Sequence, residues 1–69
     1  MYNYTVTLTN FGNVIYSGSD LATALGKAEQ AGFEATLMID YDDPPYGSGQ
    51  EFRSYSPIGG WRTISKQQK

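Results

Sequence analysis

A chain of 69 residues without cysteine or histidine has to hold its fold together by packing alone. Disulfides are excluded, and so are the usual zinc, haem and iron–sulfur sites, because their ligands come chiefly from these two residue types. A domain of this size buries only about 60% of the surface that its unfolded chain exposes. The sequence therefore predicts one small domain over residues 1–69 with a compact hydrophobic core and no cofactor.

Aromatic side chains supply much of the material for that core. Tyrosine, phenylalanine and tryptophan together make up 14% of the chain, and each such ring can bury about 150–250 Å². A few rings can therefore replace many aliphatic residues. Tyrosine also tolerates contact of its hydroxyl end with water, so several of these side chains are equally suited to an outer face.

The first half of the chain predicts a hairpin followed by a helix. Apolar residues at every second position over 2–8 indicate a strand with one buried face, and turn residues at 10–13 lead into a second strand. Ser19 or Asp20 can accept from the free N–H groups of a first helical turn, and Gly32 suits the left-handed residue after a helix. We expect a helix over 20–31 whose alanine-rich side packs on the sheet.

Three more strands are predicted after the helix, at 35–42, 51–55 and 61–65, with a long hairpin loop over 43–49. Gly59-Gly60 suits a two-residue loop between the last two strands. Neither register of that hairpin separates polar from apolar residues, and residues 66–69 are expected to fray. The predicted fold class is α+β: an antiparallel sheet of four to five strands with one helix packed on one face, in the order β-β-α-β-β-β.

Charge is divided unevenly along the chain. Residues 1–51 hold all seven acids and one base, whereas residues 52–69 hold four bases and no acid. No export leader is recognisable, and no apolar run approaches the ~20 residues of a bilayer-spanning helix. We expect a cytoplasmic protein without a membrane partner.

The stretch DYDDPPYGSGQE at residues 40–51 is the segment that most suggests a site. Asp40, Asp42 and Glu51 fall at positions 1, 3 and 12 of a twelve-residue calcium loop. Positions 5 and 6 are prolines, where such a loop needs an oxygen ligand and a glycine, and the flanks are predicted strands rather than helices. That excludes a calcium loop of this kind, and a weak cation site at Asp40, Asp42 and Asp43 is disfavoured, so no metal is expected.

The same stretch suits a contact surface for another protein. Tyrosine is enriched at interface hot spots, acids complement a basic partner, and two prolines stiffen the segment, which reduces the entropy lost on binding. Ordinary turn chemistry accounts for the same composition. The predicted protein-binding residues are Asp40, Tyr41, Asp42, Asp43, Tyr46 and Glu51, with Tyr41, Tyr46 and Asp42 as the first contacts.

Nucleic-acid binding is the first alternative. Its residues would be Arg53, Tyr55, Trp61 and Arg62, which combine bases with rings as single-strand binders do on a sheet face. Few positive charges are present in this region, whereas a typical binder neutralises about 6–10 phosphates, so protein binding is preferred. A self-assembling subunit that pairs through an exposed sheet edge is the second alternative.

Catalysis is not expected. Without histidine and cysteine the usual nucleophile–base pairs cannot form. A carboxylate pair such as Asp40 with Glu51 could be imagined for acid–base work. A domain this small, however, leaves little room for a cleft of ~300 Å³ or more.

The layout of the chain resembles the small accessory proteins of bacteriophages and prophages, among them the anti-CRISPR proteins. The likeness lies in a first strand reading YTVTL, an alanine-rich helix that exits through AGFEA, and an end reading GGWRTI. It implies a stoichiometric inhibitor or adaptor in the host bacterial cytoplasm that occludes a surface of a larger bacterial complex, such as a CRISPR effector. The oligomeric state is left open, a homodimer included.

Overall fold

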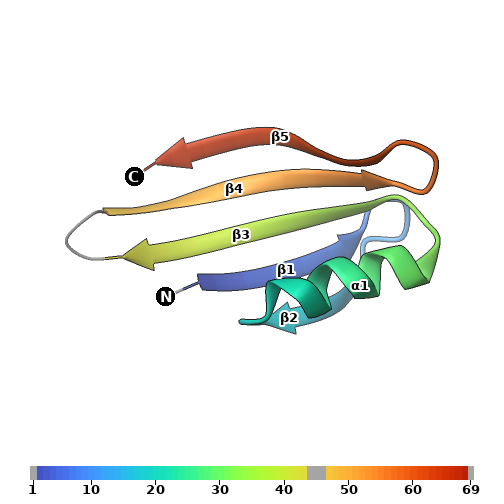
Figure 1. Cartoon of the computed structure of the whole chain (residues 1–69), viewed down its shortest axis with the longest axis horizontal. Helices are drawn as coiled ribbons and strands as arrows, with labels where there is room; N and C mark the ends of the chain where they lie inside the picture. The colour runs from blue at the N-terminus through green and yellow to red at the C-terminus, as the bar shows by residue number, and fades with distance from the viewer. Residues whose placement is uncertain (1, 44–46, 69) are drawn as a thin grey trace.

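The computed structural model describes residues 2–43 and 47–68, and its elements follow the predicted order. One helix, α1 (Leu21–Ala31), interrupts five strands: β1 (Tyr2–Leu8), β2 (Val14–Gly18), β3 (Ala35–Asp43), β4 (Gly47–Ser56) and β5 (Gly60–Gln68). The strands pair antiparallel in one sheet of order β2-β1-β3-β4-β5 (Figure 1). The predicted α+β class is confirmed.

Helix α1 begins within one residue of its predicted start and ends at the residue that the sequence predicted. The carboxylate of Asp20 accepts from the Ala22 N–H at 3.2 Å, which satisfies one of the donors that a first helical turn leaves open. Gly32 follows the last turn with φ 73° and ψ 16°, the left-handed conformation that glycine adopts without strain. The two ends therefore fix the helix locally.

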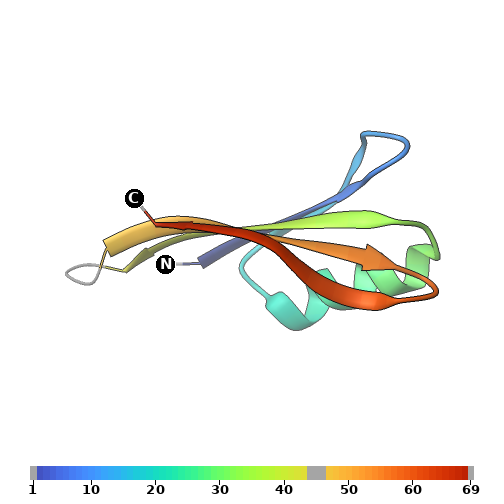
Figure 2. The same cartoon turned by 90° about the horizontal axis from the view of Figure 1, so that it is seen from above.

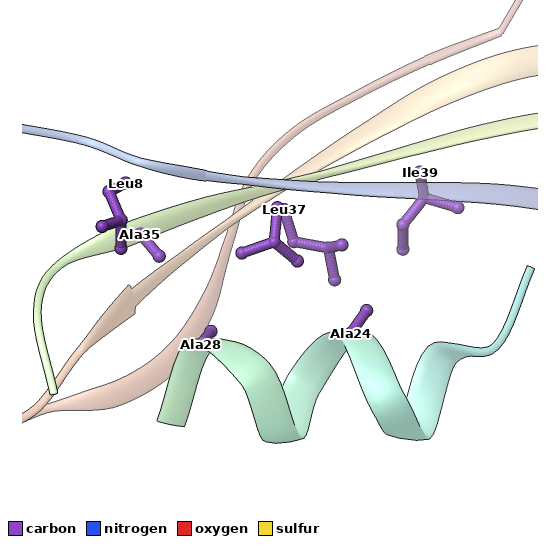
Figure 3. Close-up of a cluster of buried hydrophobic side chains, with 7 residues drawn as sticks. Leu8, Ala24, Ala28, Ala35, Leu37 and Ile39 are labelled. Atoms are coloured by element: carbon purple, nitrogen blue, oxygen red, sulfur yellow. The ribbon is translucent and has the colours of Figure 1, made fainter. Parts of the chain in front are cut away.

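The core lies between α1 and the middle of the sheet. Val6 on β1 and Leu37 on β3 are fully buried and face Ala24 and Ala28 of the helix, which are also 0% exposed. Figure 3 shows the sheet side chains pointing toward the two alanines, with Ile39 over the N-terminal end of the helix. Small helix residues let the helix approach the sheet closely, as the sequence predicted. The expectation that rings supply much of the core is wrong: the buried side chains of the described residues are all aliphatic, and the rings pack half-buried against them.

The last two hairpins differ from the prediction in their strand ends. Pairing between β3 and β4 continues to Asp43 and Gly47, so these strands extend into the segment that was predicted as a long loop over 43–49. Strand β5 likewise continues to Gln68 instead of fraying after Ser65. The turn before β5 is not the expected Gly59-Gly60 loop: Ser56 pairs with Gly60 across residues 57–59, and Gly60 carries the positive φ of 78°.

Phe33, which follows the helix stop at Gly32, lies against the turn between β1 and β2. Its ring contacts Phe11 of that turn, with centroids 5.4 Å apart and planes at 81°. The Thr9 N–H donates to the Glu34 carbonyl at 3.0 Å, which holds this turn beside the chain that leaves the helix.

The helix covers only one half of the sheet. An eleven-residue helix is about 16 Å long, whereas the ten residues of β4 span about 33 Å. Figure 2 shows the sheet edge-on, with α1 below one half and no element above or below the other half. We call this second half, which carries the start of β1, the end of β3, the start of β4 and the end of β5, the projecting half.

Candidate functional site

The two faces of the projecting half differ in chemistry. Strand pairing sets Tyr2 beside Tyr41 and Ile39 beside Glu51, on the same face as the buried core. Asp40 and Asp42 alternate with these residues and lie on the opposite face. We call the first the tyrosine face and the second the acidic face. The predicted protein-binding residues are therefore divided between two surfaces.

Three tyrosines form a layer on the tyrosine face. The ring of Tyr2 stacks on Tyr41 with centroids 5.7 Å apart, and on Tyr4 with centroids 6.3 Å apart, both at 21° between planes. Tyr2 is 48% exposed, and the other two rings are half-buried. Because each ring supports its neighbour, the layer is ordered without a covering element.

Charged side chains from β4 and β5 border the three tyrosines. Arg53 Nε donates to Glu51 Oε2 at 2.6 Å, and the two side chains are 32% and 14% exposed. Lys66 lies opposite Glu51 in the β4–β5 register. Among the described residues, Lys66 makes no ion pair. The group thus contains two cations and one anion.

These residues enclose a pocket of about 270 Å³ beside the first residue of α1. Its lining combines an apolar wall with the three charged groups and consists of Tyr2, Tyr4, Leu21, Ile39, Tyr41, Glu51, Arg53 and Lys66. All of the strand residues in this set share the tyrosine face. We call it the tyrosine pocket.

The acidic face carries a second hollow, of about 210 Å³, lined by Asn3, Asp40, Tyr41 and Asp42. Asp40, Asp42 and Asn3 are exposed. Tyr41 borders both hollows and so lies between the two surfaces. The acidic face is suited to a cationic partner surface, while the tyrosine pocket offers rings and a positive rim.

Two of the predicted contacts cannot be located as side chains. Tyr46 lies outside the described residues. The backbone of Asp43 pairs with Gly47 at the end of β3. Tyr41 and Glu51 are brought together in the tyrosine pocket, and Asp40 and Asp42 on the acidic face.

The residues of the nucleic-acid alternative are also divided. Arg53, Tyr55 and Trp61 share the face of the core, whereas Arg62 pairs with Ser54 on the opposite face. The Trp61 and Tyr55 rings contact each other with centroids 5.0 Å apart. The Trp61 Nε1 donates to Glu29 Oε2 on α1 at 3.1 Å. Both rings pack against the core, so neither forms an open platform for bases.

Tyr2 and Tyr4 were not predicted as site residues, and Lys66 was not predicted to lie beside Tyr41 and Glu51. The period-two pattern of β1 does place both tyrosines on one face with Val6, and that signal was available. Their position beside Tyr41 follows only from the pairing of β1 with β3, which joins segments some 37 residues apart. Lys66 enters the site because β5 continues beyond its predicted end.

Neither a metal centre nor a membrane span is found in the part of the chain that the structure describes. No three acidic side chains there gather closely enough to hold an ion, and no helix there has the length and apolarity to cross a bilayer. Comparison of the chain with protein-family models, curated proteins and solved structures finds no match.

Proposed function

We propose that this protein is a non-enzymatic protein-binding module that occupies a surface of a larger protein complex, with the projecting half as its contact element. The observation that carries this proposal is that the projecting half extends beyond α1 with both faces uncovered (Figure 2). Its tyrosines are already stacked against one another. Ordered rings lose little side-chain freedom on binding, and tyrosine is prominent among the residues that dominate interface energies.

The size of the projecting half indicates how a partner would hold it. About 17 Å of strand beyond the helix and four strands spaced about 4.8 Å apart give roughly 300 Å² on each face. A specific interface buries about 800 Å² on each partner. One face is too small, so we propose that the projecting half inserts into a cleft that closes on both faces.

The charge of each face indicates the walls of that cleft. Exposed Asp40 and Asp42 on the acidic face complement a basic wall. A phage-type inhibitor or adaptor would use such a contact to occlude a bacterial complex, and the resemblance in layout makes a CRISPR effector the first target to test. Contacts between exposed charges act mainly on association rate and weaken with salt.

A charge reversal on the acidic face tests the proposal. Tagged wild type, Asp40→Lys and Glu34→Lys are compared in capture from nuclease-treated bacterial lysate at low and high salt. Glu34 is exposed but lies where the chain leaves α1, so its variant has the same net charge without touching the projecting half. We expect D40K to capture several-fold less of the partner protein than wild type, and E34K to capture as much as wild type. Equal capture by D40K and wild type, or capture that requires nucleic acid, would overturn the proposal.

A further inference from the structure

The tyrosine pocket carries a net positive charge. Arg53 and Glu51 neutralise one another through their 2.6 Å contact. Lys66 stands opposite Glu51 as a second cation, without an ion pair among the described residues. A ligand that fits this charge brings one anionic group.

The remainder of the lining is apolar or aromatic. Ile39 is only 4% exposed and forms part of the core, so the pocket reaches the hydrophobic interior at that point. Leu21 adds an aliphatic wall from the first residue of α1. The ligand therefore needs an apolar body attached directly to its anionic group.

The volume of the pocket limits the size of that body. About 270 Å³ lies just below the roughly 300–1,000 Å³ of pockets that enclose drug-sized molecules. A single amino-acid residue is a suitable occupant. Only the last residue of a chain carries a carboxylate and an apolar side chain together.

We infer that the tyrosine pocket binds the carboxyl-terminal residue of a partner protein when that residue is aromatic or aliphatic. This inference rests on the function proposed above, since it says which part of the partner would contact the tyrosine face when the projecting half is inserted into a cleft. The terminal carboxylate lies toward Lys66 and Arg53, and the side chain packs on the stacked tyrosines. Arg53 is already held by Glu51, so it is positioned to receive the carboxylate at little entropic cost.

A nucleic-acid strand fits the pocket less well. Base stacking on tyrosine would be favourable, but the chain is acidic overall, with a net charge of −2. The exposed Asp40 lies on the reverse side of the same strand as Tyr41. A nucleic-acid strand would bring several phosphate charges near these acidic residues, whereas a single carboxylate contacts only the pocket.

The inference is tested by titrating small probes into the full chain and recording backbone amide signals by NMR. The probes are N-acetyl-phenylalanine, its neutral amide N-acetyl-phenylalaninamide, and an eight-residue oligothymidylate. We expect the acid to shift the signals of Tyr2, Ile39, Tyr41 and Arg53, with a Kd on the order of 1 mM for a ligand of this size. The amide should bind at least about fivefold more weakly, because it lacks the charge that Lys66 and Arg53 receive.

Two variants of β5 form a matched pair for the same titration. Lys66→Gln removes a cation from the tyrosine pocket, and Arg62→Gln removes one from the opposite face of the same strand. We expect K66Q to weaken N-acetyl-phenylalanine about two- to fivefold, the range for one exposed ion pair, and R62Q to leave it unchanged. Both residues are exposed, so neither change should unfold the domain.

Each outcome bears on the inference. Equal binding of acid and amide, equal loss in K66Q and R62Q, or no shift around the pocket overturns it. Stronger shifts of the same signals by the oligothymidylate replace it with nucleic-acid binding. The titration needs no partner protein, so a pocket that binds the acid while D40K captures normally contradicts the proposed function alone. If no probe shifts the signals of the pocket but D40K captures less partner protein than wild type, this inference alone is contradicted.

Discussion

Asp20 is held at the start of α1 by two donors. Its carboxylate accepts from the Ala22 N–H at 3.2 Å and from the Thr23 hydroxyl at 2.6 Å. The hydrogen bond from the Thr23 hydroxyl is the largest cause that holds the pKa of Asp20 below its ordinary value of 3.8. Desolvation opposes this shift, and the backbone N–H groups of Thr23 and Ala22 add to the lowering. The sequence narrowed this cap to Ser19 or Asp20, because a cap depends on residues within one helical turn.

We predict a small acid-dependent contribution of Asp20 to stability. Since its pKa is lower in the folded chain, the contribution is complete above pH 3.8 and is lost as the pH falls through the folded value. Asp20→Asn keeps a capping acceptor that does not titrate. Urea unfolding followed by Trp61 fluorescence should show wild type as slightly more stable than D20N at pH 7, with the difference vanishing toward pH 2.

Thr23→Val provides the control, because it removes the main cause of the lowered pKa and leaves the carboxylate in place. In the T23V variant, the Asp20→Asn substitution should change the pH dependence of the free energy of unfolding less than it does in wild type. A wild-type advantage over D20N that persists unchanged to pH 2 would mean that the cap does not act through its charge.

At the scale of elements, α1 packs on the sheet through alanines. Ala28 is 0% exposed between the helix and the sheet, whereas Ala22 of the same helix is exposed. We predict that Ala28→Leu destabilises the domain by about 1–3 kcal/mol, since the added side chain has no space between the two layers. Ala22→Leu should change stability little. Chemical unfolding of both variants measures the difference, and equal stabilities would show that the layers can separate to accept a larger residue.

The sequence predicted the elements better than their ends. Helix α1 was predicted to within a residue because Asp20 and Gly32 act locally. Strands β3, β4 and β5 were predicted too short because Gly47, Ser48 and Gly49 have little strand propensity by themselves and are held by pairing with β3. The bulge that places Ile64 as an extra residue of β5 shifts the register, and no local pattern marks it.

The candidate site illustrates the same limit. Alternation along β3 places Tyr41 on the opposite face of the sheet from Asp40 and Asp42. The sequence did not show that Tyr2 would stack on Tyr41, since that contact needs the order of the strands. Nor did it show that Lys66 would stand opposite Glu51, because that pairing depends on the bulge and on the true end of β5.

For the whole molecule, folding partly removes the division of charge along the chain. Arg53 from the basic end pairs with Glu51 from the acidic part, and Lys66 joins them across the β4–β5 pair. Exposed acids remain on the acidic face and basic residues remain on β5. The molecule thus presents an acidic face and a basic edge at different places on one sheet.

The basic edge also limits self-association through the sheet. Strand β5 is an edge strand of nine residues, and Ile64 at its bulge is 58% exposed. An unpaired edge of this length can recruit another strand, while bulges and positive charges oppose such pairing. Because of the bulge, Arg62 and Lys66 lie on opposite faces of β5, so each face of this edge carries a positive charge. A second β5 strand paired along the edge would bring its own Arg62 and Lys66 alongside, and like charges would then lie on both faces of the pair.

We predict that removing the two charges promotes association. Like charges brought together across two strands are destabilising, on the scale of about 0.2–1 kcal/mol for a cross-strand pair, so Arg62→Thr with Lys66→Thr should strengthen self-association several-fold, while threonine preserves the strand. Light scattering over a concentration series should show a rising mass for this variant. Lys27→Thr, an exposed change on α1, should leave the mass unchanged. A wild type that is already dimeric and insensitive to both changes would place the contact elsewhere than β5, whereas a dimer that tightens only in R62T/K66T would identify β5 as the edge through which copies of this chain pair.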